Sequence, residues 1–161
     1  MTMAKYLLDT NACIGIRNHI KGNTSKDPAR RAAQQKLIAR WQAMPAADLA
    51  MSLFTLGELR VYVQRFSDAT QRANANALLD QVIAKISVID QPGTDPQAGD
   101  AHALAHHYGD IRASLELAGT PVADNDLWIA AHARVHGLTV VTNNLSDFAH
   151  VPGLATEDWT A

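Results

Sequence analysis

Short runs of strand-forming residues alternate along this chain with longer stretches of helical periodicity. Because helices are the usual connections between neighbouring parallel strands, this order predicts an α/β fold with a mostly parallel sheet. We expect strands at residues 5–8, 48–51, 86–89 and 139–142, and a weaker fifth strand at residues 155–157.

The start of one intervening helix is well marked. Asp27 followed by Pro28 is typical of a helix N-terminus, because the aspartate accepts hydrogen bonds from free N–H groups and proline fits the first turn. We expect helices at residues 28–44, 69–85, 96–118 and 125–135, and a further helix that begins near Leu56.

Length and composition restrict the class of protein. The chain has 161 residues and a mass of 17.4 kDa, and we expect one domain over residues 1–161. With 47% hydrophobic and 19% charged residues it resembles a soluble globular protein. No run approaches the ~20 apolar residues of a membrane span, and the N-terminus lacks the pattern of a signal peptide. We therefore expect a cytoplasmic protein without a membrane partner.

The single cysteine, Cys13, excludes an internal disulfide and agrees with a reducing compartment. Its place near an expected helix start could lower its pKa and make it a nucleophile. The interpretation that we favour is an inert, small residue of the core.

The charge balance argues against a generally nucleic-acid-binding surface. Fourteen Lys and Arg stand against 16 Asp and Glu, which gives a formal charge of -2. Binding to nucleic acid would therefore need a local basic patch or a metal ion. The candidate basic side chains are Lys26, Arg30, Arg31, Lys36, Arg40 and Arg112. A solvated helix face is the alternative for this group.

Four acids follow or precede the expected strands in a regular way. Asp9 closes the first strand, Glu58 follows the second, Asp126 opens the helix before the fourth, and Asp147 follows the fourth. Loops and helix N-termini converge beyond the carboxyl ends of parallel strands. We therefore expect these four side chains to lie at one edge of the sheet.

Each acid also has a purely structural alternative. Glu58 lies three residues after Thr55, which is the spacing of a capping box. Asp126 could lie in a first turn capped by Asp124, where the helix dipole favours a carboxylate. Asp9 could cap the helix that follows it, and the fourth acid could be an ordinary loop residue.

Several like charges in one small region are costly unless a cation offsets them. The neighbouring amides are Asn11, Asn143 and Asn144. Carboxylate and amide oxygens without cysteine form a hard site, which suits Mg2+ or Mn2+.

Two histidine pairs raise the alternative of zinc. His102 and His106 are four residues apart, as are His132 and His136. Both pairs lack the glutamate of an H-E-x-x-H site. We therefore expect these histidines on exposed polar helix faces.

Three segments, "LLDTNACI", "SLFTLGELRVYV" and "GTPVADNDLWIAAHARVHGLTVVTNNLSDFAHVPGLATEDW", resemble in order the PIN-domain ribonucleases that serve as VapC toxins of bacterial toxin–antitoxin pairs. The resemblance extends from Lys5 to Trp159. It implies a PIN-like three-layer fold, in which a small parallel sheet of four to five strands lies between helices, with an acidic pocket for Mg2+ or Mn2+.

The resemblance also assigns residues. Asp9, Glu58 and Asp126 match the three core acids of the family. Many PIN domains have an aspartate where this chain has Asn144, and Asp147 lies three residues further on. Two other positions are auxiliary candidates: Asn11 after the first strand, and Asp124, where relatives usually have a small residue or proline.

The resemblance implies a metal-dependent endoribonuclease, and the segments are most similar to the enteric-type toxins that cut initiator tRNA in its anticodon stem-loop. It further implies a cognate antitoxin and a homodimer or toxin–antitoxin hetero-oligomer. One alternative is a catalytically inactive PIN domain that binds RNA or protein. Another is a phosphatase with Asp9 as nucleophile, which would need an acid where Asn11 stands.

Overall fold

The computed structural model describes residues 4–93 and 102–161, which form one five-stranded parallel sheet and the helices around it. In chain order the elements are β1 (Tyr6–Leu8), α1 (Thr10–Lys21), α2 (Pro28–Ala43), the 3-10 helix η1 (Ala46–Asp48), β2 (Leu49–Ser52), α3 (Leu53–Gln64), α4 (Ala69–Lys85), β3 (Ser87–Ile89), α5 (Ala103–Leu117), α6 (Asp124–His136), β4 (Thr139–Val141), α7 (Leu145–Phe148) and β5 (Thr156–Glu157).

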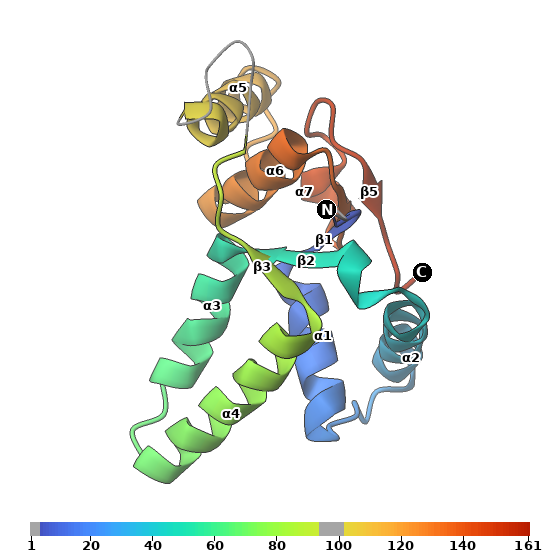
Figure 1. Cartoon of the computed structure of the whole chain (residues 1–161). Helices are drawn as coiled ribbons and strands as arrows, with labels where there is room; N and C mark the ends of the chain where they lie inside the picture. The colour runs from blue at the N-terminus through green and yellow to red at the C-terminus, as the bar shows by residue number, and fades with distance from the viewer. Residues whose placement is uncertain (1–3, 94–101) are drawn as a thin grey trace.

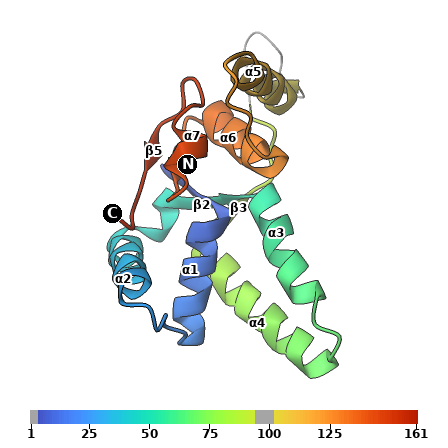
Figure 2. The ribbon, with the colours of Figure 1, turned by 180° about the vertical axis from the view of Figure 1, so that it is seen from behind.

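The sheet has the strand order β3-β2-β1-β4-β5, and all its pairings are parallel. It lies between α1 to α4 on one side and α5 to α7 on the other (Figure 1). Seen from behind, α1 runs away from the sheet between α2 and α3 (Figure 2). The predicted three-layer α/β architecture is confirmed.

Consecutive strand residues point to opposite faces of the sheet, and both faces are buried. Leu7 packs into the core below α5 and α6, whereas its neighbour Leu8 packs into the core with α1 to α4. Neither leucine has measurable exposure. A strand of three residues can therefore serve two cores, because helices cover it on both sides.

The expected boundaries agree with most elements and differ in two informative places. The expected strands coincide with β1 to β5 to within one residue at each end. The helix expected near Leu56 begins at Leu53, directly after β2, so the start was placed three residues too late. The expected helix at residues 96–118 corresponds to α5 from Ala103, and its first part lies outside the described residues.

Cys13 is fully buried, and burial raises the pKa of its thiol, so the inert core role is confirmed.

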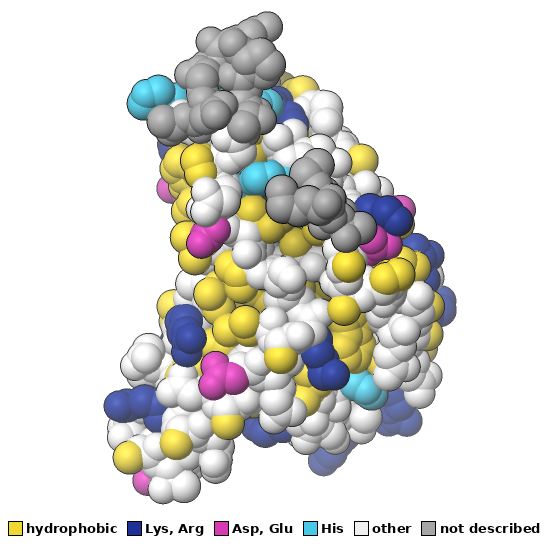
Figure 3. Space-filling view, viewed as in Figure 1, with side chains coloured by type: hydrophobic (Ala, Val, Ile, Leu, Met, Phe, Trp, Pro, Cys, Tyr) yellow, Lys and Arg dark blue, Asp and Glu magenta, His cyan; other side chains and the backbone are white. Residues whose placement is uncertain are grey.

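Within the described ranges, the helices are too short or too polar to cross a membrane. On the face seen in Figure 3, hydrophobic side chains gather in the middle.

A glycine sets the distance between α1 and α2. A Cβ atom added to Gly15 would lie 2.6 Å from Cδ2 of Leu37, which is buried in α2. We expect Gly15→Ala to lower the free energy of unfolding by about 0.5–2 kcal/mol, because displacing the Leu37 methyl within the core costs more than alanine gains in a helix. Gly57→Ala in α3 is the matched control, since nothing lies within 4 Å of its added Cβ.

The control should stabilise the protein by about 0.5–1 kcal/mol, as expected for a helical glycine replaced by alanine. Urea unfolding of both variants measures the difference. Equal stability of the two variants would contradict the close α1–α2 packing.

Candidate active site

The centre of the sheet is a switch point, because β1 pairs with β2 on one side and with β4 on the other. The chain leaves β1 toward α1 and leaves β4 toward α7, so loops diverge beyond the carboxyl ends of these two strands. In open parallel sheets ligands bind at such a point. The first residue after β1 is Asp9.

Asp9 is fixed in a buried position. Its side chain is the N-cap of α1, where Oδ1 accepts a hydrogen bond from the backbone N of Ala12 at 2.8 Å. Its own backbone N donates to the carbonyl of Val141 at 3.0 Å. The residue is only 3% exposed, and burial raises the pKa of its carboxyl while a hydrogen bond from Thr142 lowers it. The predicted cap is therefore present, and the other carboxylate oxygen is not needed for it.

Glu58 reaches the same region from α3. The hydroxyl of Thr10, the residue after Asp9, donates to Glu58 Oε1 at 2.8 Å. The capping-box interpretation is wrong, because α3 is capped by Ser52, whose Oγ accepts from the backbone N of Phe54 at 3.1 Å. Glu58 therefore lies in the second turn and serves no N-cap.

Asp126 lies in the first turn of α6, and three other acids act on it. Its pKa is raised from 3.8 to about 6, first by burial and then by the charges of Asp9, Glu58 and Asp147. The expected cap at Asp124 is wrong, because the N-cap position is Ala123 and it makes no side-chain cap. The charges of Asp9, Glu58 and Asp147 therefore act on Asp126, as expected for four acids at one edge of the sheet.

Asp147 is oriented by a neighbour. Asn144 Nδ2 donates to Asp147 Oδ2 at 2.9 Å, and Asn144 Oδ1 accepts from Ser146 Oγ at 2.8 Å. Asn144 thus fixes the orientation of the Asp147 carboxylate. Asn11 is exposed and, with Thr142, lines a small depression beside the switch point.

A further acid, Asp158, belongs to this region and was missed from the sequence. Its charge also raises the pKa of Asp9, and it follows β5 directly. Its Oδ1 accepts hydrogen bonds from the backbone N of Thr160 at 2.8 Å and from the Thr160 hydroxyl at 2.6 Å. An acid directly after a strand could have indicated Asp158, but β5 has only two residues and gives a weak sequence pattern.

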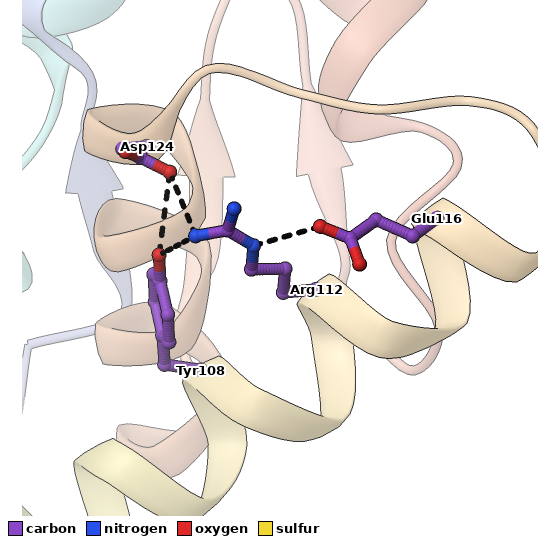
Figure 4. Close-up of polar contacts among 4 residues, drawn as sticks. All are labelled: Tyr108, Arg112, Glu116 and Asp124. Carbon is purple, nitrogen blue, oxygen red and sulfur yellow. Dashed lines mark hydrogen bonds and ion pairs between the residues drawn. The ribbon is translucent and has the colours of Figure 1, made fainter.

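Asp124 makes a different set of contacts (Figure 4). Its Oδ1 accepts from Arg112 Nη1 at 3.2 Å and from the hydroxyl of Tyr108 at 3.3 Å. Arg112 is also held by Glu116 at 2.8 Å and by the Tyr108 hydroxyl at 2.9 Å. The Asp124 side chain is 70% exposed, and in this conformation it serves the α5–α6 contact.

The basic side chains of α2 are partly engaged within their own segment. Arg31 donates to the carbonyls of Ser25 and Lys26 at 3.0 and 3.2 Å. Arg30 lies 3.7 Å from Asp27. Their exposed guanidinium groups remain candidates for contact with an anion.

The donor set fits a hard divalent cation, since the converging groups are carboxylates without sulfur or imidazole. Within residues 4–93 and 102–161, no three His, Cys, Asp or Glu side chains are close enough to enclose an ion as they stand. In this structure the acids therefore interact through their charges and do not enclose a common site.

The histidine expectation is wrong for one residue. His132 is 1% exposed, and both it and His136 direct Nε2 to the carbonyl of Gln91, at 2.8 and 3.1 Å. These nitrogens are therefore occupied by a backbone oxygen.

Comparison with known proteins agrees with this geometry. Residues 6–154 match the model of the PIN domain. The tRNA(fMet)-specific endonuclease VapC of Salmonella typhimurium is 37% identical over 161 residues, which cover 98% of this chain and 99% of the relative. The chain therefore belongs to the PIN-domain family, in the group of VapC ribonucleases.

Solved structures are similar over the same extent. A DNA-bound VapBC from Salmonella typhimurium has a TM-score of 0.68 at 32% identity, with 98% of this chain and 99% of that chain covered. VapBC2 from Rickettsia felis, bound to a DNA fragment from its promoter, also has a TM-score of 0.68, at 26% identity, with 96% and 98% covered.

Proposed function

We propose that this chain, as one domain over residues 1–161, is the ribonuclease toxin of a toxin–antitoxin pair and uses Mg2+ or Mn2+ to cleave RNA. The observation that carries the proposal is the coupling of Asp9, Glu58 and Asp147 to Asp126 at the switch point of the sheet. Carboxylates that resist joint ionisation are a common feature of functional sites and are stabilised by a cation.

Each acid has a distinct part. Asp9 and Asp126 would hold the ion, and the cap of α1 engages only Oδ1 of Asp9. Glu58, which accepts a hydrogen bond from Thr10, would be a further ligand of the ion or would orient its water. When bound, a divalent ion offsets the charge of the phosphodiester and lowers the pKa of a coordinated water. Cleavage would leave 5'-phosphate and 3'-hydroxyl ends.

Auxiliary groups support these three acids. Asn144 would keep Asp147 directed toward the site through its 2.9 Å hydrogen bond. Asn11 and Asp124, which are both exposed, would be auxiliary groups that act through a bound water. Since the acids repel phosphate, RNA binding should depend on the ion and on nearby cations. Arg112 is the cation next to Asp124, and Arg30 and Arg31 are further candidates.

The substrate and partners are carried over from relatives. A relative 37% identical to this chain is named a tRNA(fMet)-specific endonuclease. We extend this to initiator tRNA, cut in its anticodon region, as the substrate here. The similar solved structures are VapBC assemblies, which supports a cognate antitoxin that covers the acidic site. We also propose that the toxin forms a homodimer within that hetero-oligomer.

Sequencing of RNA 5' ends after brief expression tests the function. Wild type should create new 5'-phosphate ends concentrated at one position in initiator tRNA, and Glu58→Gln should not. New ends in another RNA would change the proposed substrate but would still support a ribonuclease. New ends that persist with Glu58→Gln would remove Glu58 from the site. No new ends with wild type would contradict the proposed function and favour a PIN domain that only binds.

A further inference from the structure

A buried polar chain connects the two helices that carry Glu58 and Asp126. Ser52 caps α3 six residues before Glu58, and His132 lies in α6 six residues after Asp126. Ser52 Oγ lies 2.9 Å from His132 Nδ1, across 80 residues of sequence. Ser52 has no measurable exposure and His132 is 1% exposed, so water cannot replace either partner.

The partners fix the positions of the protons. Ser52 Oγ accepts from the backbone N of Phe54 at 3.1 Å, and its hydroxyl hydrogen can be donated to His132 Nδ1. The carbonyl of Gln91 can only accept, so His132 Nε2, at 2.8 Å, carries the other hydrogen. Burial lowers the pKa of the imidazole and so favours the neutral ring, in which Nδ1 is bare and accepts from the Ser52 hydroxyl.

Aromatic packing makes this connection stiff. Phe54 stacks on Trp128 with ring centroids 5.1 Å apart and meets His132 edge-on at 6.0 Å. Trp128 in turn stacks on Tyr108 of α5 at 3.8 Å. The contact between α3 and α6 is therefore set by one hydrogen bond and two ring contacts, and it lies on the same two helices as two of the acids.

We propose that His132 is a positioning residue: through Ser52 and Gln91 it fixes α3 against α6 and so sets the separation of Glu58 and Asp126. The inference rests on the proposed function, because the separation matters only if the two acids serve one ion. A displacement of catalytic groups by about 1 Å can lower a rate about a hundredfold. A hydrogen bond outside the ligand sphere can change metal affinity by roughly 10- to 100-fold.

Three variants and one control test this role. Ser52→Ala removes the hydroxyl, His132→Phe keeps a ring but removes both hydrogen bonds, and His132→Gln offers one acceptor and one donor again. Val82→Ala in α4 is the control, because it opens a cavity in the other core and removes no part of the connection from Ser52 through His132 to Gln91. The readouts are thermal stability, the Kd of Mn2+ alone by calorimetry, and kcat and KM on RNA.

We expect Ser52→Ala and His132→Phe to weaken Mn2+ binding and to lower kcat by about 10-fold each, with KM within about twofold. His132→Gln should stay within about threefold of wild type, and Val82→Ala should lose stability alone. If Mn2+ affinity and kcat of the first two variants match those of Val82→Ala, the positioning role is overturned.

Nitrogen NMR of the wild-type histidines keeps the inference testable even if a variant does not fold. At pH 7 His132 should show a protonated Nε2 and a bare Nδ1. The opposite tautomer would overturn the inference, because a bare Nε2 could not donate to the Gln91 carbonyl. Failure of the proposed function is recognised separately, as wild-type protein that neither binds Mn2+ nor cleaves RNA.

Discussion

Asp9→Asn should lower RNA cleavage at least about a thousandfold while the protein stays folded. Loss of a charged metal ligand removes several kcal/mol of transition-state stabilisation, and about 1.4 kcal/mol corresponds to a factor of ten. The fold should persist because asparagine caps a helix as well as aspartate does, so the 2.8 Å hydrogen bond from Ala12 is kept. Cleavage of purified tRNA in Mg2+ and thermal unfolding measure the two effects.

Asp68→Asn is the matched control. Asp68 caps α4 in the same way, since its Oδ1 accepts from the backbone N of Gln71, three residues on, at 2.8 Å. It is exposed and lies away from the switch point. The control should keep wild-type cleavage and stability. Full activity of Asp9→Asn, with the control also active, would contradict the proposed mechanism.

Asp126→Asn should have opposite effects on activity and on stability. Cleavage should fall about a thousandfold for the same reason as at Asp9. Without metal, however, the variant should be more stable at pH 7 by about 1–2 kcal/mol: one pKa unit corresponds to about 1.4 kcal/mol, and the value is reduced because Asp126 is only partly buried. Its pKa is raised from 3.8 to about 6, so the folded state disfavours the charged form.

The sign of the pH dependence follows from that shift. Between pH 4 and 6 the folded wild type binds the Asp126 proton more tightly than the unfolded chain does, so this contribution to stability is lost as the pH rises through about 6. Urea unfolding in EDTA at pH 5 and pH 7 should show a smaller gain from Asp126→Asn at the lower pH. A gain independent of pH, or none, would contradict the electrostatic coupling.

Asp124→Asn tests whether any aspartate in the first turn of α6 would give the gain in stability expected for Asp126→Asn. Asp124 lies two residues earlier in α6, its side chain is 70% exposed, and it pairs with Arg112 at 3.2 Å. An exposed ion pair contributes about 0–1 kcal/mol, so this variant should be unchanged or slightly less stable.

The position of Asp9 could be predicted because two local signals agreed. A run of apolar residues ended in an acid, and the acid stood before a helical pattern. Parallel pairing then brings the ends of β1, β2 and β4 to one edge without any knowledge of side-chain contacts. The site could therefore be predicted mainly from the parallel direction of these strands.

The start of α3 could not be placed correctly from local rules. β2 runs into α3 without a loop, so Ser52 is both the last strand residue and the helix cap. A strand end gives no turn signal in such a case, and Thr55 with Glu58 imitated a capping box. Only the hydrogen bond from Thr10 to Glu58, across 48 residues, shows what the glutamate contacts.

Long-range contacts also explain the error at His132. Its helical spacing with His136 suggested an exposed face, but its partners Ser52 and Gln91 lie 80 and 41 residues away in sequence. Asp158 was missed for a similar reason, since β5 has two residues and gives almost no periodic signal. Pairing with β4 places that strand end beside the site.

Anomalous diffraction from crystals soaked in Mn2+ would test the shared ion most directly. We predict a manganese peak at the switch point, bonded to carboxylate oxygens of Asp9 and Asp126, with Glu58 turned toward it. A protein that cleaves RNA yet places its manganese away from Asp9 and Asp126 would contradict the proposed site.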